Sequence, residues 1–225
     1  MSVNEDRTAQ PSPATAAPAT GIADPAPLGL AAFALTTFLL SAKNADWMTH
    51  ATGNAWLGYA LAYGGIAQLL AGMWEFRNRN VFGATAFGTY GSFWIGLFLW
   101  VRFVVDPAVA AAKPATLAAT VTALNHDLGW ILLVFAIFNT YMLILSAQVN
   151  MAVFGVFLTL EITEIILCIG NFNAGAALNP TTTIKIGGYV GLLTALVAWY
   201  ASAAGVSNGI AAGKLRFPAG RPLIS

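Results

Sequence analysis

Six stretches of this chain, each roughly 20 residues long, consist almost entirely of apolar side chains. A bilayer core about 30 Å thick is crossed by about 20 helical residues, so each stretch is long enough to span a membrane. The stretches are apolar on every face, whereas the strands of a membrane β-barrel alternate polar and apolar residues. We therefore predict an all-α membrane protein with six transmembrane helices. The predicted spans are residues 28–47, 56–76, 82–105, 127–147, 151–170 and 185–204.

The composition agrees with this prediction and excludes several other classes of protein. Only 8% of the 225 residues are charged, and the mean hydropathy is +0.71. About a quarter of the residues of an average soluble protein are charged, so a soluble enzyme, a disordered chain and a nucleic-acid-binding protein are excluded. The net charge of +1 gives no reason to expect a polyanionic partner.

Residues that usually hold metals, cofactors or nucleotides are scarce. The chain has one cysteine, Cys168, and two histidines, His50 and His126, far apart in the sequence, with no metal-ligand spacing. The glycines that follow Lys185 lack the Gly-Lys-Ser/Thr ending of a phosphate-binding loop. We expect no metal and no cofactor, so any pumping would draw on an ion gradient or on a partner chain.

The parts of the chain outside the spans are expected to be simple. Residues 1–23 are rich in Pro, Ala, Thr and Ser and cannot bury enough apolar surface to offset chain entropy, so we expect a disordered tail. The six-span transporter domain then covers residues 24–204, and residues 205–225 form a C-terminal tail. The longest connection is predicted at residues 106–126.

An even number of spans places both termini on the same side of the membrane. With the termini inside, six Lys and Arg residues are cytoplasmic and four lie at the outer side, which is the bias of the positive-inside rule. We therefore expect both tails in the cytoplasm. The six are Arg7, Arg77, Arg79, Lys214, Arg216 and Arg221, and the four are Lys43, Arg102, Lys113 and Lys185.

Four motifs occur in order along the predicted spans. A capping role explains Asp24 and Pro25 at the head of the first span, but it does not explain Pro27 and Gly29, which weaken a helix as it enters the membrane. The motifs are Asp24-Pro25-Ala26-Pro27-Leu28-Gly29-Leu30, residues 63–72, residues 85–94 and Ile169-Gly170-Asn171. Together they resemble the signatures of the acetate uptake transporters, the succinate–acetate permease family, over residues 24–204.

The resemblance implies a six-helix plasma-membrane protein that assembles as a homo-hexamer with a pore in each subunit. Such proteins carry acetate and similar short monocarboxylates, and in some members succinate. The resemblance also implies a hydrophobic constriction formed by a Phe, a Tyr and a Leu, which match Phe33, Tyr90 and Leu160. We call these three residues the constriction.

The chain departs from the family pattern at three positions. Asp24 replaces the signature Asn and adds a negative charge near the predicted pore mouth. Glu161 and Glu164 replace apolar residues on the fifth span. Each carboxyl within a membrane span is a candidate for function by default. A structural pair with Arg102, or a protonated carboxyl in a helix contact, remains the alternative.

Polar side chains near the constriction are candidate substrate ligands. Thr36 and Thr37 share a helix face with Phe33, although threonines also bond back to their own helix. Gln68 lies in the middle of the second span and would donate either to a carboxylate or to a neighbouring helix.

The fifth span provides two further candidates. With about 100° of rotation per residue, Glu164 is turned by about 40° and Asn171 by about 20° from Leu160. Both are therefore predicted to line the pore, whereas Glu161 is predicted to point to the side.

We predict a membrane transporter or channel for acetate and similar short monocarboxylates, with the lipid bilayer as its surroundings and no nucleic acid as a partner. Acetic acid is almost entirely an anion at neutral pH, so uptake against an inside-negative potential requires proton co-movement or a steep gradient. Three alternatives remain open. They are a channel for a neutral solute such as urea or a short amide, export of ammonium or ammonia, and a structural or sensor subunit without solute flux.

Overall fold

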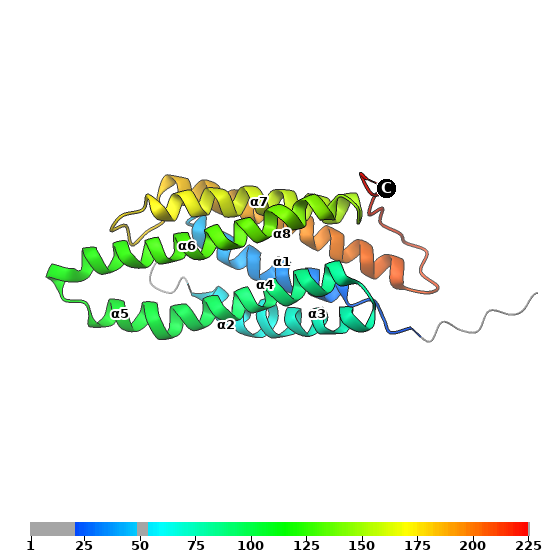
Figure 1. The fold of residues 1–225 in the computed structure, drawn as a ribbon, viewed down its shortest axis with the longest axis horizontal. Coiled ribbons are helices and arrows are strands. Elements are labelled where there is room, and N and C mark those ends of the chain that lie inside the picture. The colour runs from blue at the N-terminus through cyan, green and yellow to red at the C-terminus, as the bar shows by residue number, and fades with distance from the viewer. Residues whose placement is uncertain (1–20, 49–53, 225) are drawn as a thin grey trace, which may run out of the picture.

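Long helices lie side by side along the described part of the chain, residues 21–48 and 54–224 of a computed structural model (Figure 1). Helices α2, η1 and α3 follow one another without a break, as do α4, η2 and α5, so the described residues form six helical rods. The elements are α1 (Ala26–Asn44), α2 (Ala55–Leu61), the π-helical η1 (Ala62–Ala67), α3 (Gln68–Arg77), α4 (Val81–Trp100), the π-helical η2 (Val101–Val105), α5 (Asp106–Ala111), α6 (Pro114–Ser146), α7 (Met151–Phe172) and α8 (Thr182–Gly209).

Five of these rods have the length and hydropathy of a single membrane-spanning helix. They are Ala26–Asn44, Val81–Ala111, Pro114–Ser146, Met151–Phe172 and Thr182–Gly209. The predicted second span, residues 56–76, is also helical, but η1 divides it into pieces of 7, 6 and 10 residues. A Cβ atom on Gly65 would lie 2.5 Å from the Ala60 carbonyl oxygen, so glycine permits the wide turn at this position.

Residues 106–126, predicted as a connection, are almost entirely helical. Helix α5 continues the rod of α4, and α6 begins at Pro114 and runs for 33 residues. Pro114 occupies the first turn of α6, where a missing amide hydrogen costs nothing, whereas Pro107 directly follows the π-helical η2 inside the continuous rod. A 33-residue helix is about 50 Å long, so α6 extends well beyond a hydrocarbon core of about 30 Å.

The C-terminal segment, residues 210–224, folds back onto the bundle. Helix α8 extends past the predicted end of the sixth span to Gly209. Beyond it, the Ala219 carbonyl accepts from the Ala152 amide (2.9 Å), and the Ala147 carbonyl accepts from the Leu223 amide (2.7 Å). The expected C-terminal tail is therefore anchored to the bundle by hydrogen bonds, although most of its residues are exposed. The disordered tail predicted for residues 1–23 lies outside the described residues, except for 21–23.

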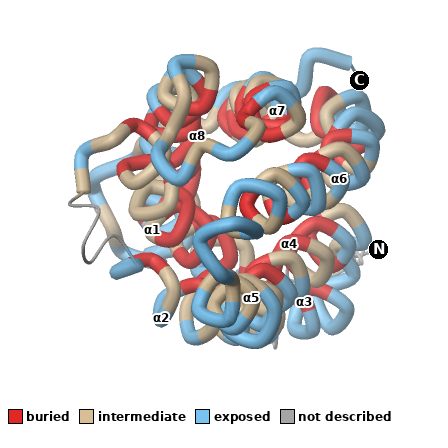
Figure 2. Tube along the Cα trace, turned by 90° about the vertical axis from the view of Figure 1, so that its left-hand side faces the viewer, coloured by how far each residue is buried: buried red, intermediate tan, exposed pale blue. Residues whose placement is uncertain are grey.

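The rods enclose a common centre. Helix α1 packs on α8, α8 on α7, and α7 on α6, while α3 packs on α4. Aromatic contacts close the remaining side between α4 and α6, because the ring centroid of Phe93 lies 4.6 Å from that of Phe135. An end-on view shows buried residues on the inward sides of the helices (Figure 2).

The outer surface of the bundle is apolar. Large side chains on α6 and α8 are more than half exposed, including Ile137 (61%), Ile144 (63%) and Leu196 (54%). Contiguous apolar surface of this kind is rare on a soluble monomer. It is the surface that the lipid-facing side of a membrane-spanning bundle requires.

Candidate functional site

Two cavities lie at opposite ends of the bundle. The larger, which we call the wide cavity, has a volume of about 640 Å³ and is lined by Asn54, Asp106 and Pro180 among others. The smaller, the narrow cavity, has a volume of about 240 Å³ and is lined by Asp24 and Ala219 among others. Both ends of the described chain therefore lie at the narrow cavity.

The constriction lies between the two cavities. On each of α1, α4 and α7, one residue lines the narrow cavity, a later residue lines the wide cavity, and Phe33, Tyr90 or Leu160 falls between them in the sequence. The flanking pairs are Leu30 and Leu40 on α1, Phe87 and Phe93 on α4, and Phe157 and Leu167 on α7. The three residues therefore occupy the same level of the bundle.

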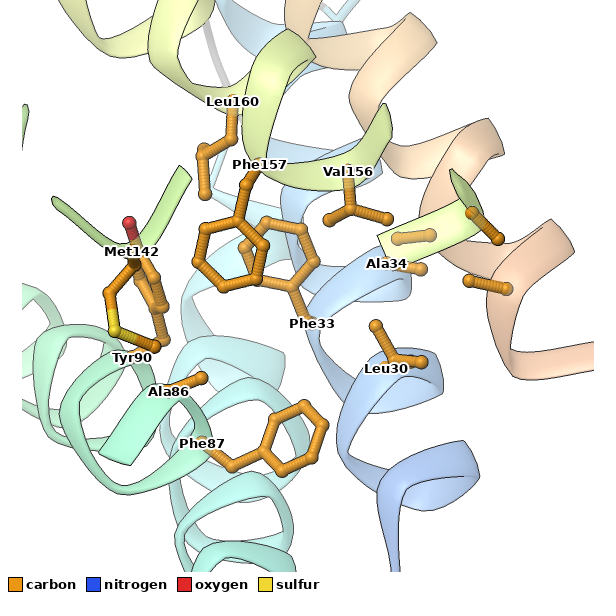
Figure 3. Packing of buried hydrophobic residues seen from close by; sticks show 13 residues of the cluster. Leu30, Phe33, Ala34, Ala86, Phe87, Tyr90, Met142, Val156, Phe157 and Leu160 are labelled. Carbon is orange, nitrogen blue, oxygen red and sulfur yellow. The ribbon is translucent and has the colours of Figure 1, made fainter. Parts of the chain in front are cut away.

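The side chains of the constriction are brought together in one buried cluster. Phe33 is 5% exposed, Tyr90 3% and Leu160 6%, and they converge from three helices (Figure 3). The rings of Phe33 and Tyr90 pack edge to face with centroids 5.8 Å apart. Because Met142 and Phe157 fill the same cluster, the structure is closed between the two cavities.

Asn139, a polar residue on α6, contacts the hydroxyl group of Tyr90. The Tyr90 hydroxyl donates to Asn139 Oδ1 (2.9 Å), and its oxygen also lies 3.3 Å from Glu164 Oε1. Asn139 is fully buried and Glu164 is 4% exposed. Asn139 was not among the predicted site residues, although a lone amide in an apolar span is the same signal that drew attention to Gln68.

Asn139 also connects to the second carboxyl of α7. Its Nδ2 donates to the Phe157 carbonyl (3.0 Å) and to Glu161 Oε2 (2.7 Å). The Thr140 hydroxyl donates to Glu161 Oε1 at 2.8 Å. Glu161 is thus turned towards α6. Arg102 was the alternative partner for Glu161 or Glu164. It pairs with Asp106 instead, at 2.9 Å.

The predicted polar ligands on α1 and the second span lie in helix contacts. The Thr36 hydroxyl donates to the Ala32 carbonyl (3.0 Å) and lies 3.4 Å from the Tyr59 carbonyl. Thr37 Oγ1 and Gln68 Oε1 are buried and have no hydrogen-bond partner among the described residues. None of these three side chains lines either cavity.

Glu164 and Asn171, the two predicted site residues on α7, lie at different levels of the bundle. Asn171 lines the wide cavity, and its Nδ2 donates back to the Leu167 carbonyl (2.8 Å). Glu164 is buried beside Tyr90, and its Oε2 has no hydrogen-bond partner among the described residues. Glu164 therefore lies at the level of the constriction, whereas Asn171 lies in the wide cavity.

The segment from Asp24 to Leu30 forms one wall of the narrow cavity. Helix α1 begins at Ala26, with Pro25 as its N-cap, two residues before the predicted span of residues 28–47. Asp24 still caps the helix start, because its Oδ1 accepts from the Ala26 amide at 3.0 Å. Leu28 is half-exposed, whereas Leu30 belongs to the buried cluster of the constriction.

Contacts with neighbouring helices explain the two unusual residues of this segment. The Pro27 carbonyl accepts from the Ser202 hydroxyl of α8 at 2.7 Å. A Cβ atom on Gly29 would lie 2.7 Å from the ring of Phe87 on α4. Pro27 and Gly29 therefore join the entrance of α1 to α8 and α4.

Charged groups near the wide cavity are mostly paired. Lys185 Nζ lies 2.5 Å from Asp46 Oδ2. Lys43 lines the wide cavity, donates to Asn54 Oδ1 (3.1 Å) and lies 5.5 Å from the ring centre of Trp56. Among residues 21–48 and 54–224, no group of three or more His, Cys, Asp or Glu side chains is placed to hold a metal ion.

Comparisons with known proteins agree with this architecture. The profile of the GPR1/FUN34/yaaH family matches residues 6–212. Acetate permease A of Emericella nidulans is 38% identical over 190 residues, which cover 83% of this chain and 62% of that protein. The succinate-acetate/proton symporter SatP of Escherichia coli K12 is 33% identical over 189 residues, covering 84% of this chain and 91% of SatP.

A solved structure extends the comparison to three dimensions. The structure of the bacterial acetate channel SatP matches with a TM-score of 0.73 and 30% sequence identity, over 88% of this chain and 99% of that chain. This match confirms the predicted all-helical membrane fold, and it makes the protein a multi-pass membrane protein. The family predicted from the four motifs is also confirmed: this chain belongs to the GPR1/FUN34/yaaH family.

Proposed function

We propose that this protein carries acetate or a similar short monocarboxylate across a membrane, along a path within each chain that joins the two cavities. The observation that best supports this is the position of Phe33, Tyr90 and Leu160 between the wide and narrow cavities on three separate helices. The relatives described above include an acetate permease and a succinate-acetate/proton symporter, which indicates the same substrate class. The chain covers 62% of the length of acetate permease A.

The constriction would select by size and by hydration. A narrow apolar ring removes water from a passing solute and excludes larger or doubly charged species. The hydroxyl of Tyr90 and the carboxyl of Glu164 lie at the same level, so they are the nearest groups that could replace lost hydration. Thr36, Thr37 and Gln68 would support this level from behind, and Asn171 would meet the substrate in the wide cavity.

We further propose that the protein is a homo-hexamer of the plasma membrane with both termini in the cytoplasm. The excess of Lys and Arg on the terminal side supports this orientation. The narrow cavity would then face the cytoplasm, and the wide cavity would receive substrate from outside.

Uptake of labelled acetate into proteoliposomes tests this function. Vesicles with the purified full-length protein are expected to take up acetate in a saturable manner, faster than protein-free vesicles prepared from the same lipid. An imposed pH gradient, acid outside, should increase the uptake. Equal uptake by the two kinds of vesicle, with and without the gradient, would contradict the proposal.

A channel for urea or a short amide is the second candidate. Glu164 Oε2 is a buried acceptor without a partner among the described residues, and an amide N–H would satisfy it. Labelled urea in the same proteoliposomes separates the two functions, because a urea channel should carry urea and leave acetate outside.

A further inference from the structure

The orientation of the Asn139 amide follows from its neighbours. Its Nδ2 lies between two acceptors, the Phe157 carbonyl oxygen at 3.0 Å and Glu161 Oε2 at 2.7 Å. An amide nitrogen has two hydrogens to donate and its oxygen can only accept. The Asn139 oxygen must therefore face Tyr90 and accept the phenolic proton at 2.9 Å.

This arrangement uses the single proton of Tyr90. A phenol donates one hydrogen bond and accepts others through its oxygen. The Tyr90 oxygen also lies 3.3 Å from Glu164 Oε1, and no phenolic proton remains for that contact. The contact is a hydrogen bond only when Glu164 carries a proton and donates it to Tyr90.

Within residues 21–48 and 54–224, the helix segments around Glu164 carry no positive charge that would balance an ionised carboxylate. No Lys, Arg or His occurs on α1 between Ala26 and Ala42, on α4, on α6 after Leu128, or on α8 after Ile186. A charged side chain at this depth is costly without a partner. The charge balance of the neighbouring helices therefore agrees with the hydrogen-bond pattern.

The titratable groups that face this site are few. Tyr90 on α4 and Glu161 on α7 interact with Glu164, and Tyr141 on α6 interacts with Tyr90. On α8 the titratable residues after Ile186 are Tyr189 and Tyr200, and both are exposed. Glu161 accepts two hydrogen bonds and is partly exposed, so its place differs from that of Glu164.

We propose that the constriction passes the monocarboxylic acid in its protonated, neutral form, and that Glu164 is the residue that selects this form. The hydrogen-bonded series from Glu161 through Asn139 and Tyr90 keeps a proton on Glu164. Its Oε2, which has no other partner among the described residues, then accepts the acidic O–H of the substrate. Asn139 is the positioning residue. This inference rests on the proposed function and specifies the form of the substrate.

The neutral form requires no proton transfer at the constriction. The substrate keeps its proton while it passes the apolar ring, and Glu164 keeps its own. Among the described residues of this site there is no cation, and Glu164 Oε2 is an acceptor without a partner, so an anion would find no donor there. Transport of the acid moves one proton with each substrate molecule.

The pH dependence of acetate uptake tests the proposal in proteoliposomes of equal pH inside and outside. Neutral acid crosses lipid unaided, so uptake by protein-free vesicles is subtracted at each pH. At constant total acetate, the protein-dependent initial rate is expected to fall about tenfold per unit between about pH 6 and pH 8, as the neutral acid does. A potassium diffusion potential should not change the rate, and methanesulfonate, a permanent anion of similar size, should not compete.

Three outcomes are distinguishable in that experiment. A rate that is independent of pH and driven by the membrane potential, or strong competition by methanesulfonate, would show that the anion passes and would overturn the inference. Absence of protein-dependent uptake at every pH would instead overturn the proposed function. Uptake that follows the neutral acid supports both.

Variants at Glu164 test the residue itself. Glu164→Gln keeps a neutral donor for Tyr90 and an acceptor for the substrate, so it is expected to retain protein-dependent uptake that falls with pH as in the wild type, even where its rate is lower. Glu164→Leu lacks the acceptor and should lose at least about tenfold. Glu75→Gln, at a fully buried carboxyl on α3, is the matched control and should behave like the wild type.

Variants at Asn139 distinguish the proposed positioning role from a purely structural role. Asn139→Leu frees the Tyr90 proton for Glu164, allows that carboxyl to ionise, and should reduce uptake most at neutral pH. Adding Glu164→Gln to Asn139→Leu should restore uptake, because glutamine cannot ionise. Loss of uptake in Glu164→Gln alone, with the protein folded and assembled, would overturn the proposal.

Discussion

The rings of Phe33 and Tyr90 meet edge to face, with centroids 5.8 Å apart and planes inclined by 63°. This contact joins α1 to α4 at a level that neither the wide nor the narrow cavity reaches. An aromatic pair of this kind contributes about 0.5–1.5 kcal/mol beyond the burial of its area. A contact of that strength is weak enough to break if the proposed path opens at this level.

Leu160→Ala should widen the constriction and admit larger acids. Interiors relax only partly when a large side chain is shortened, so a gap remains. A hydrophobic site discriminates by about 1–3 kcal/mol per methylene, and the lactate-to-acetate uptake ratio is therefore expected to rise tens-fold. Competition between labelled acetate and unlabelled lactate measures this ratio.

Leu192→Ala is the control for that change. Leu192 is 5% exposed and packs with Ala42 and Ala45, away from the constriction. It should lower stability to a similar degree without changing the ratio. An unchanged ratio in a correctly assembled Leu160→Ala protein would remove Leu160 from the path.

Tyr90→Phe should separate the packing role of the Tyr90 ring in the constriction from the role of its hydroxyl as a hydrogen-bond donor. The phenyl ring keeps its contact with Phe33, whereas Asn139 Oδ1 loses its donor. A buried acceptor left without a partner costs about 1–3 kcal/mol, which thermal unfolding in detergent should detect. Size selectivity between acetate and lactate should stay as in the wild type, and a changed selectivity would mean that the ring itself has moved.

The length and composition of the apolar runs predicted the helical membrane fold, because crossing a bilayer demands a minimum length of apolar helix. The same reasoning could not place Pro107 and Pro114, since a proline starts a helix or ends one depending on its neighbours. The π-helical turn of η1 has no apolar pattern of its own. The segment after Gly209 shows no periodicity either, and its course depends on contacts with Ala147 and Ala152.

Part of the candidate site could be predicted from the sequence motifs. The motifs led to Phe33, Tyr90 and Leu160, which the structure brings together. Asn139 stands alone in an apolar run, and its role depends on Tyr90, which lies 49 positions earlier in the chain. Thr36 lies on the expected helix, but its hydroxyl bonds back to Ala32. The bond of Thr36 is local to its helix, whereas the partner of Asn139 is decided by packing between distant segments.

Gly72→Ala should disrupt the contact between α3 and α4. A Cβ atom there would lie 2.6 Å from the Gly88 backbone nitrogen, which cannot move as a side chain can. Overpacking of this kind costs about 1–3 kcal/mol. Gly96→Ala on α4 is the control, because nothing lies within 4 Å of its Cβ position. Equal melting temperatures for the two variants would contradict the packing described for α3 and α4.

Asp24→Asn should keep the start of α1 and change the charge of the narrow cavity. Asparagine can accept from the Ala26 amide as Asp24 does, so stability is expected to stay the same. Because a negative charge does not repel the neutral acid, efflux is expected to match the wild type at low and at high salt, and efflux that rises only at low salt would show that the anion passes this mouth. Asp24→Ala should lose about 1 kcal/mol of local stability. Equal efflux for Asp and Asn at every ionic strength would limit Asp24 to its capping role.

The most direct test of the path is to block it at Leu160. The chain has one cysteine, the buried Cys168, so Leu160→Cys can be placed in a Cys168→Ser background. Treatment of proteoliposomes with methyl methanethiosulfonate should stop acetate uptake, and acetate present during the treatment should slow the block. The Cys168→Ser protein alone should keep its uptake. Complete labelling of the cysteine at position 160 with undiminished uptake would show that substrate does not pass this residue and would contradict the account.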